Sequence, residues 1–461
     1  MSSIISSLTT GQIAGLTTTA IHGLKTTDIA ALAVTQAAVL TAAQVNNLTT
    51  TDLQFLATTQ VQALAPSVIN ALVNLQIQSF TTTQITELTT AQFAVLTASQ
   101  IGSLSTTELT TLSTTQANAL TATQIGSLTT TVLNNLTTAQ AAALSNAQVQ
   151  GLTTSQINGL SAANLDVIDA TKFKTSQLSG LTTTALNNLT TTQAAALVST
   201  QLQSLTATQV SGLSAANLDA ADTTKLTTTQ VAGLSTTAIS RLTTTQVVAL
   251  TAAQAAALTS AQIGQLSTTE LTTLTTTAAN ALTATQIGSL TTTVLNNLTT
   301  AQAAALSNAQ VQGLTTSQIN GLSAANLDVI DATKFTSNQV GGLTTTAIHA
   351  LTTTQVASLT ASDIGRLSVA QVNSLSTTEI AAFTTTQARA LTAAQLAGLT
   401  VPNFTALTST TGIPGLSVAA IAGITTTEIT NLTTTQGNAF TNAQIAALSI
   451  DQVSALVTLV G

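Results

Sequence analysis

The sequence predicts an all-α solenoid of short capped helices, with one helix for each eight-residue repeat. Three observations lead to this fold class: leucine recurs every eight residues, a helix-capping signal follows each leucine, and the few charged residues follow the helix dipole. The alternative fold is a β-solenoid, because threonine-rich runs favour strands by intrinsic propensity.

The repeat is an octad that begins at a leucine, as in Leu120-Thr-Ala-Thr-Gln-Ile-Gly-Ser, which Leu128 follows. We number the leucine as position 1. Positions 2 to 4 are Thr, Ser or Ala, position 5 is usually Gln, position 6 is mostly aliphatic, and positions 7 and 8 are small. Leu8 and Leu456 are 448 residues apart, and without the 16 residues of irregular insertions this length is 54 octads. We therefore expect residues 1–461 to form a single continuous repeat solenoid.

The octad favours helix over strand because of its internal spacings. Threonine at position 2 and glutamine at position 5 form the T-x-x-Q capping box, and positions 1 and 6 are the hydrophobic staple pair. Position 6 and the next leucine are three residues apart, which places them on one helical face. In a flat strand, positions 1 and 6 would face opposite sides because they are separated by five and then three residues. We expect leucine and isoleucine to point inward, and threonine and glutamine to point outward.

The rare charges agree with short helices that begin near position 2. Nine acidic residues lie outside the irregular units, and seven of them occupy position 5, in the expected first turn: Asp28, Asp52, Glu108, Glu270, Asp363, Glu379 and Glu428. The two histidines, His22 and His349, both occupy position 7, in the last turn. They are more than 300 residues apart, so we interpret them as last-turn residues and not as a metal pair.

Three thirteen-residue units, each an octad plus five residues, interrupt the repeat at 160–173, 213–226 and 322–335. Calcium binds several oxygen ligands, so the aspartates of these units are candidates for a calcium site. They are Asp166, Asp169, Asp219, Asp222, Asp328 and Asp331. In the interpretation that we prefer, Asp169, Asp222 and Asp331 replace threonine as the cap of a shortened five-residue segment, which shifts the register of the solenoid.

Composition argues against several classes of function. Charged residues are 5% of the chain, and the eight Lys and Arg residues are scattered, so no basic patch for nucleic acid is expected. No apolar run approaches 18 residues, so we expect no membrane span, and the chain has no cysteine. No serine or threonine has a His and Asp constellation to activate it. We expect no enzyme, no catalytic or cofactor-binding residues, and no cofactor except calcium at the aspartates above.

The octads resemble the Thr- and Ala-rich low-complexity repeats of large bacterial surface and secreted proteins, including surface-layer and filament subunits. Leu242-TTTQVVA-Leu250 shows the LTTTQIxxL pattern that carries this resemblance, which covers nearly the whole chain. The resemblance implies an extracellular or cell-surface protein, exported without a cleaved N-terminal signal, that assembles with itself into a filament or lattice. The apolar segment 445–461 is compatible with a secretion signal and equally with an ordinary capping unit.

A second hypothesis is a binding module. In this case the chain would be a surface adhesin or ice-binding protein that presents its threonine-rich face, with a cell-surface glycan or matrix as partner.

Overall fold

In the computed structural model, which describes residues 4–461, regular structure consists of 52 short α-helices and six 3-10 helices, with no strand among the described residues. Each α-helix has four to six residues, except the last, α52 (Ile450–Val460), which has eleven. The prediction of an all-α fold is confirmed, and the β-solenoid alternative is wrong. The capping box and the hydrophobic staple recur in octad after octad, and together they outweigh the intrinsic preference of threonine for strands.

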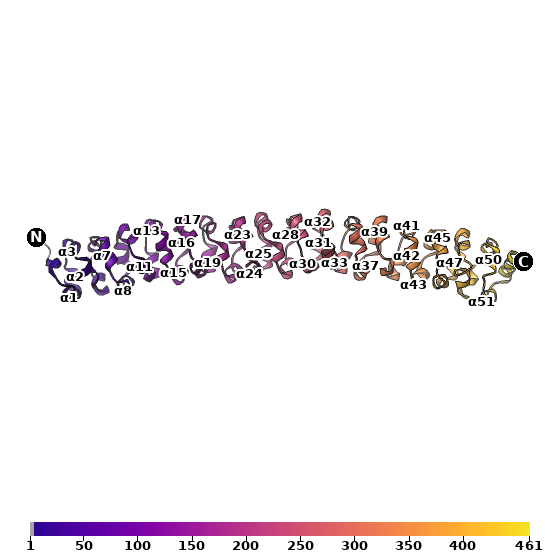
Figure 1. The fold of residues 1–461 in the computed structure, drawn as a ribbon, viewed down its shortest axis with the longest axis horizontal. Coiled ribbons are helices and arrows are strands. Elements are labelled where there is room, and N and C mark those ends of the chain that lie inside the picture. The colour runs from indigo at the N-terminus through magenta and orange to yellow at the C-terminus, as the bar shows by residue number, and fades with distance from the viewer. Residues whose placement is uncertain (1–3) are drawn as a thin grey trace. The chain divides into compact units, whose positions relative to one another are not determined.

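The chain divides into two compact units, Met1–Leu234 and Ser235–Gly461, and each of them winds as a solenoid (Figure 1). Within a unit, a helix packs on the third helix after it: α1 (Thr10–Ala14) contacts α4 (Val34–Ala37). In the second unit, α30 (Ala252–Ala257) contacts α33 (Thr276–Ala281) in the same way. Three octads, or 24 residues, therefore make one regular coil with three helical sides.

Most sides begin with a helix that a Thr or Ser side chain caps. At α12 (Ala98–Gly102), the Gln100 amide donates to the Thr97 hydroxyl at 3.2 Å, and the Thr97 amide donates to Gln100 Oε1 at 2.7 Å. This reciprocal pair is the predicted capping box. Leu96 and Thr97 are both extended, with ψ of 137° and 156°, so positions 1 and 2 redirect the chain at every corner.

The core consists of positions 1 and 6, stacked coil on coil. Leu96 is 2% exposed and Ile101 is 1% exposed, and the same positions are buried through most of both units. Helices of this length are unstable alone, so the contacts between coils stabilise them.

The thirteen-residue units contain one α-helical side and one shorter side. In residues 160–173, α20 (Ala162–Leu165) is followed by the 3-10 helix η2 (Ala170–Lys172). The equivalent 3-10 helices are η3 (Thr223–Lys225) and η4 (Ala332–Lys334). Five residues thus replace an octad as one side, and the coil that contains them has 21 residues instead of 24.

Near the end of the second unit the pattern changes. Two sides are formed by 3-10 helices, η5 (Ile413–Gly415) and η6 (Ile421–Gly423). The longer α52 then packs on α49 (Thr426–Thr430) and continues over α50 (Thr434–Gly437). Position 6 of that octad is Gly437, and a Cβ atom there would lie 2.7 Å from Val460 and 2.9 Å from Leu459. Glycine therefore allows α52 to lie across this helix.

Candidate functional site

Within each unit, the position-5 side chains form a ladder of hydrogen bonds that joins a coil to the preceding one. Gln100 uses its Oε1 atom for the capping box of its own helix. Its Nε2 atom donates to the carbonyl oxygens of Ile69 at 3.0 Å and Leu72 at 2.8 Å, 31 and 28 residues earlier. One glutamine therefore caps its own helix and binds the C-terminal end of a helix in the coil before it.

The expectation that glutamine points outward is wrong at position 5. Gln100 is 1% exposed, and Gln44, Gln92 and Gln310 are 1–2% exposed. Threonine is outward as expected, since Thr106 and Thr107 at positions 3 and 4 are exposed. Burial of these amides is tolerated because both the oxygen and the nitrogen have partners. We call this set of buried position-5 side chains the position-5 ladder.

A second set of polar contacts runs in the opposite direction, from position 7 to the following coil. Asn46 donates from Nδ2 to the Ala71 carbonyl at 2.9 Å and accepts from the Val73 amide at 3.0 Å. The histidines occupy the same place: Nδ1 of His22 lies 3.0 Å from the carbonyl oxygen of Asn47, and Nδ1 of His349 lies 3.0 Å from that of Ser374. The structure thus gives the histidines a role in coil packing, which the sequence did not predict.

The aspartates of the short sides are helix caps. Asp169 Oδ1 accepts from the Thr171 amide at 2.9 Å and from the Thr171 hydroxyl at 2.7 Å. Asp222 and Asp331 have the same contacts with Thr224 and Thr333. The hydroxyl and amide of Thr171 hold the pKa of Asp169 below its ordinary value, and their counterparts lower the pKa of Asp222 and Asp331.

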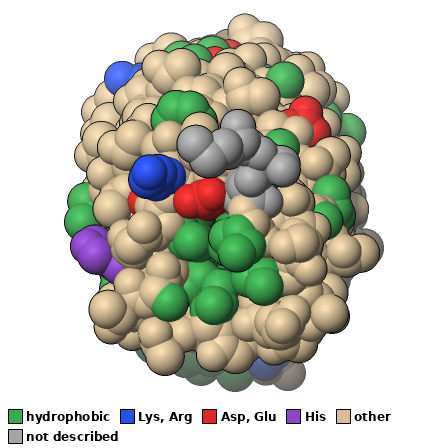
Figure 2. Space-filling model, turned by 90° about the vertical axis from the view of Figure 1, so that its left-hand side faces the viewer, with side chains coloured by type: hydrophobic (Ala, Val, Ile, Leu, Met, Phe, Trp, Pro, Cys, Tyr) green, Lys and Arg blue, Asp and Glu red, His purple; other side chains and the backbone are tan. Residues whose placement is uncertain are grey.

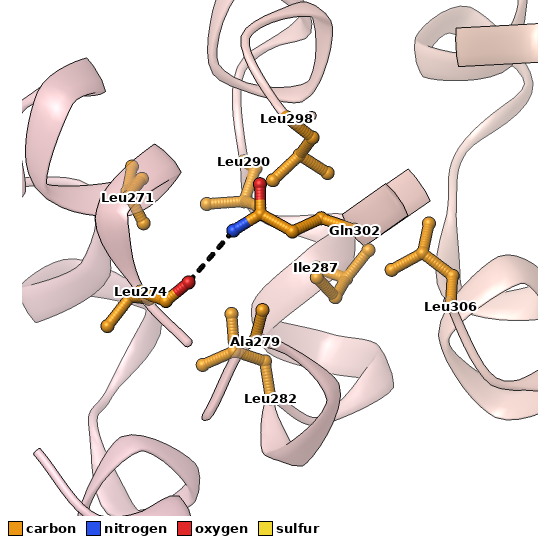
Figure 3. A pocket seen from close by; sticks show the side chains of 9 residues that line it. All are labelled: Leu271, Leu274, Ala279, Leu282, Ile287, Leu290, Leu298, Gln302 and Leu306. Carbon is orange, nitrogen blue, oxygen red and sulfur yellow. Dashed lines mark hydrogen bonds between the residues drawn. The ribbon is translucent and has the colours of Figure 1, made fainter. Parts of the chain in front are cut away.

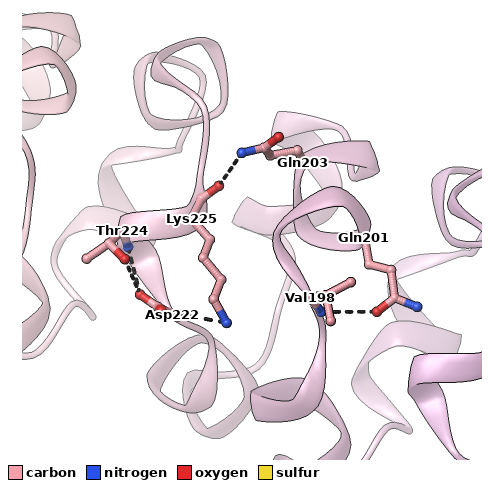
Figure 4. A network of polar contacts seen from close by, with 6 residues as sticks. All are labelled: Val198, Gln201, Gln203, Asp222, Thr224 and Lys225. Atoms are coloured by element: carbon pink, nitrogen blue, oxygen red, sulfur yellow. Dashed lines mark hydrogen bonds and ion pairs between the residues drawn. The ribbon is translucent and has the colours of Figure 1, made fainter.

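The lysine of each short side stands three residues after its aspartate. Lys172 Nζ donates to the Leu144 carbonyl at 2.8 Å, and Lys334 Nζ donates to the Leu306 carbonyl at 2.6 Å, in both cases 28 residues earlier. This is the separation that a ladder glutamine spans, so lysine replaces glutamine on a short side. Lys225 instead lies 3.7 Å from Asp222, and its carbonyl accepts from Gln203 at 3.1 Å (Figure 4).

Of the calcium candidates, Asp166 and Asp169 line one surface groove, and Asp328 and Asp331 line another. The grooves have volumes of about 310 and 450 Å³, and their opposite walls carry Thr190 and Thr352. Asp219 lies in α26 (Ala215–Ala220). Among residues 4–461, no group of three or more His, Asp or Glu side chains lies close enough to hold a metal ion.

No protein-family model matches the chain, and no curated protein is similar to it. Of the helices in the described part of the chain, none is long and apolar enough to cross a membrane.

Proposed function

We propose that the chain is a structural, non-enzymatic protein that assembles with itself into an extracellular filament or surface lattice. One observation carries this proposal: within each unit, the position-5 ladder gives a coil a donor face toward the preceding coil and an acceptor face toward the following one. A surface that stacks on a copy of itself by translation has no built-in end, and such heterologous contacts propagate into filaments.

The first coil of the described chain presents such a donor face. Leu8, Leu16 and Leu24 are half-buried there, whereas the interior Leu48 is 3% exposed. Gln12 is exposed, and its side-chain nitrogen has no acceptor among the described residues. Ile4 is 74% exposed. Figure 2 shows hydrophobic side chains gathered on this face. It is the surface that an interior coil buries against the coil before it.

The last coil is covered in part. Helix α52 buries Leu456 and half-buries Val453, Leu459 and Val460, so most of its apolar side chains form a lid over α49 and α50. Ile445 of the neighbouring side is 37% exposed, although interior position-6 residues such as Ile101 are 1% exposed. We place the acceptor contact at this side, next to α51 (Asn442–Ile445).

The extracellular location rests on the resemblance to bacterial surface repeats and on the hydroxyl-rich exterior, in a chain with only 5% charged residues. The partner is a second copy of the chain, and a cell-surface glycan or matrix is a further partner at the threonine faces. Low charge density removes the repulsion that keeps many proteins monomeric.

Electron microscopy of the purified 461-residue chain tests the proposal, with sedimentation as a second measurement. We expect ordered polymers. Leu16→Glu should prevent them, because it places a charge in the donor face, whereas Thr18→Glu on the exposed side should not. Separate particles in the wild type would contradict self-assembly and favour the adhesin or ice-binding alternative. Normal polymers from Leu16→Glu would move the contact to the lateral threonine faces.

A further inference from the structure

Several acidic residues occupy position 5, where most octads have a ladder glutamine. A side chain at this position needs two different groups: an acceptor for the cap of its own helix and a donor for the carbonyl oxygens of the preceding coil. Asparagine also provides the donor, because Asn164 Nδ2 lies 3.2 Å from the Leu133 carbonyl and 3.1 Å from the Leu136 carbonyl. An ionised carboxylate has two acceptors and no donor.

Glu428 and Asp363 show the consequence most clearly. Glu428 Oε2 accepts from the Thr425 amide at 2.6 Å and its hydroxyl at 2.8 Å. Asp363 Oδ2 accepts from the amide and hydroxyl of Thr360, both at 2.7 Å. The other oxygens, Glu428 Oε1 and Asp363 Oδ1, are buried and have no hydrogen-bond partner. The two side chains are only 2% and 4% exposed.

These unpartnered oxygens stand in the place where glutamine and asparagine carry their amide nitrogen. In that place the ladder residues meet backbone carbonyl oxygens of the coil before. A negative oxygen there would be desolvated and would face acceptors alone, which is strongly unfavourable. A neutral carboxylic acid has the shape of the amide and supplies the missing O–H donor.

We propose that Glu428 is a proton-binding site, held as a neutral acid whose O–H donates to a backbone carbonyl of the preceding coil. Stacking of the coils at this position is therefore coupled to pH. The inference is independent of self-assembly, because it concerns contacts inside one chain.

Few charges lie near Glu428. Its helix packs on α48 (Val401–Thr405), which has no charged residue, and on α52, in which only the exposed Asp451 is charged.

Burial raises the pKa of Glu428, in agreement with a neutral acid.

The sign of the pH effect follows for Glu428. Its folded-state pKa is above its unfolded value of 4.5, so its favourable contribution to stability is complete below that value. The contribution is lost as pH rises through the raised folded pKa. The coils around α49 should therefore be more stable in mild acid than at neutral pH.

The test uses the full chain and one amide substitution, Glu428→Gln. Difference infrared spectroscopy should show the carbonyl band of neutral carboxylic acids in the wild type at a pH about one unit above the ordinary carboxyl value. The Glu428→Gln variant should lack this component. Native-state hydrogen exchange, corrected for intrinsic rates, should show protection of α49 falling about tenfold or more between about pH 4 and pH 8 in the wild type.

Glu428→Gln should keep α49 equally protected at both pH values, because its amide supplies the donor without titrating. Asp451→Asn is the matched control on the neighbouring helix and should leave the pH dependence unchanged. The proposal is overturned if the wild type lacks the neutral-acid band, if its exchange does not depend on pH, or if Asp451→Asn removes that dependence.

Discussion

Residues 101–173 in the first unit and residues 263–335 in the second are nearly the same sequence in separate surroundings. Of 73 positions, 70 are identical. The three differences are Ser103 against Gln265, Ser113 against Thr275, and Gln116 against Ala278. Only the last changes a position-5 residue, so the pair shows what one member of the ladder contributes.

In the first copy, Gln116 belongs fully to the ladder. Its Oε1 accepts from the amide and the hydroxyl of Ser113, both at 3.0 Å. Its Nε2 donates to the carbonyls of Thr86 at 2.6 Å and Leu88 at 3.0 Å. In the second copy, Ala278 keeps only the cap bond from its own amide to Thr275, at 3.1 Å. The Ala278 side chain has no donor for the carbonyl oxygen of Leu250, which is the equivalent of Leu88.

The contact between the coil of Ala278 and the coil that follows it is looser than the equivalent contact in the first copy. A small cavity of about 10 Å³ lies between these two coils, lined by Leu274, Ala279 and Leu298 among others (Figure 3). On the next coil, Gln302 Nε2 is 3.0 Å from the Leu274 carbonyl, whereas Gln140 Nε2 in the first copy is 2.7 Å from that of Leu112.

Apolar side chains on this following coil are also more exposed in the second copy. Val132 and Leu136 of the first copy are buried at 7% exposure, but their counterparts Val294 and Leu298 are only half-buried. The apolar residues at this contact are the same in both copies, so apolar stacking alone does not set how closely two coils approach. The looser contact lies one coil beyond the changed residue, because the Gln116 side chain binds the preceding coil.

The largest effect should come from exchanging the differing ladder residue. Gln116→Ala should cost about 2–4 kcal/mol of local stability, because it removes the hydrogen bonds to two carbonyls and to the cap. Ala278→Gln should gain about 1–3 kcal/mol by creating them. Native-state hydrogen exchange read by mass spectrometry can measure both, since peptides that span the differing positions are distinguishable.

The second differing cap provides the control for this exchange. Thr275→Ser should change protection little, because serine and threonine are both good caps. Equal protection of α14 (Thr114–Ala119) and α33 in the wild type would contradict the ladder interpretation.

A smaller effect, equal in both copies, is expected where lysine replaces glutamine. Lys172→Met and Lys334→Met keep the apolar stem but remove the ammonium that binds a carbonyl of the preceding coil. Each should cost about 1–2 kcal/mol, as expected for a partly exposed hydrogen bond to a charged donor. Lys174→Met is the control, because Lys174 is exposed and makes no side-chain cap bond. Exchange of η2 and η4 measures the effect, and a clear difference between the copies would show that their surroundings modify this contact.

Much of this architecture could be predicted from the octad. The capping box and the staple place each helix and select positions 1 and 6 as core. The donor role of position 5 was missed because the capping box uses only the oxygen of glutamine. A signal was present: glutamine predominates there, although Asp or Glu would complete the box and suit the helix dipole better. That preference is explained only if the amide nitrogen is also bonded.

The number of octads in a coil could not be predicted. It depends on the backbone angles at the two corner residues, such as Leu96 and Thr97, and many residue types adopt those extended angles. The position-7 contacts could not be predicted either, because they join residues that are 25 apart in the sequence. Such residues are recognised as neighbours only when the length of a coil is known. Composition and capping are local, whereas the coil is a tertiary property.

Filling the cavity should have a modest effect with opposite sign in the two copies. Ala279 is 5% exposed beside the cavity, and its counterpart Ala117 is 1% exposed. Ala279→Val should gain about 0.5–1 kcal/mol by burying methyl groups in free space. Ala117→Val should lose about 1 kcal/mol, because its surroundings are already packed. Protection of α33 and α14 from hydrogen exchange measures the change in local stability in each copy. Stabilisation by both substitutions would show that both copies have free space at this position.

The smallest effect concerns the caps of the two short sides, which are identical in the two copies. Asp169→Ala and Asp331→Ala should each cost about 1 kcal/mol or less at neutral pH, as expected for loss of an N-cap.

The hydrogen bonds from threonine lower the pKa of both aspartates in the folded state. Their contribution is therefore present above the unfolded value of 3.8 and is lost as pH falls through the lowered folded value, opposite in sign to that of Glu428. Both carboxylates are exposed, so solvent and salt screen the charge and only a slight loss is expected in acid. Asp169→Asn should keep the cap and lose this acid sensitivity, which exchange of η2 measured at falling pH can detect. If protection of η2 instead rises in acid, the carboxylate does not stabilise the short side, and the lysine contact alone holds it.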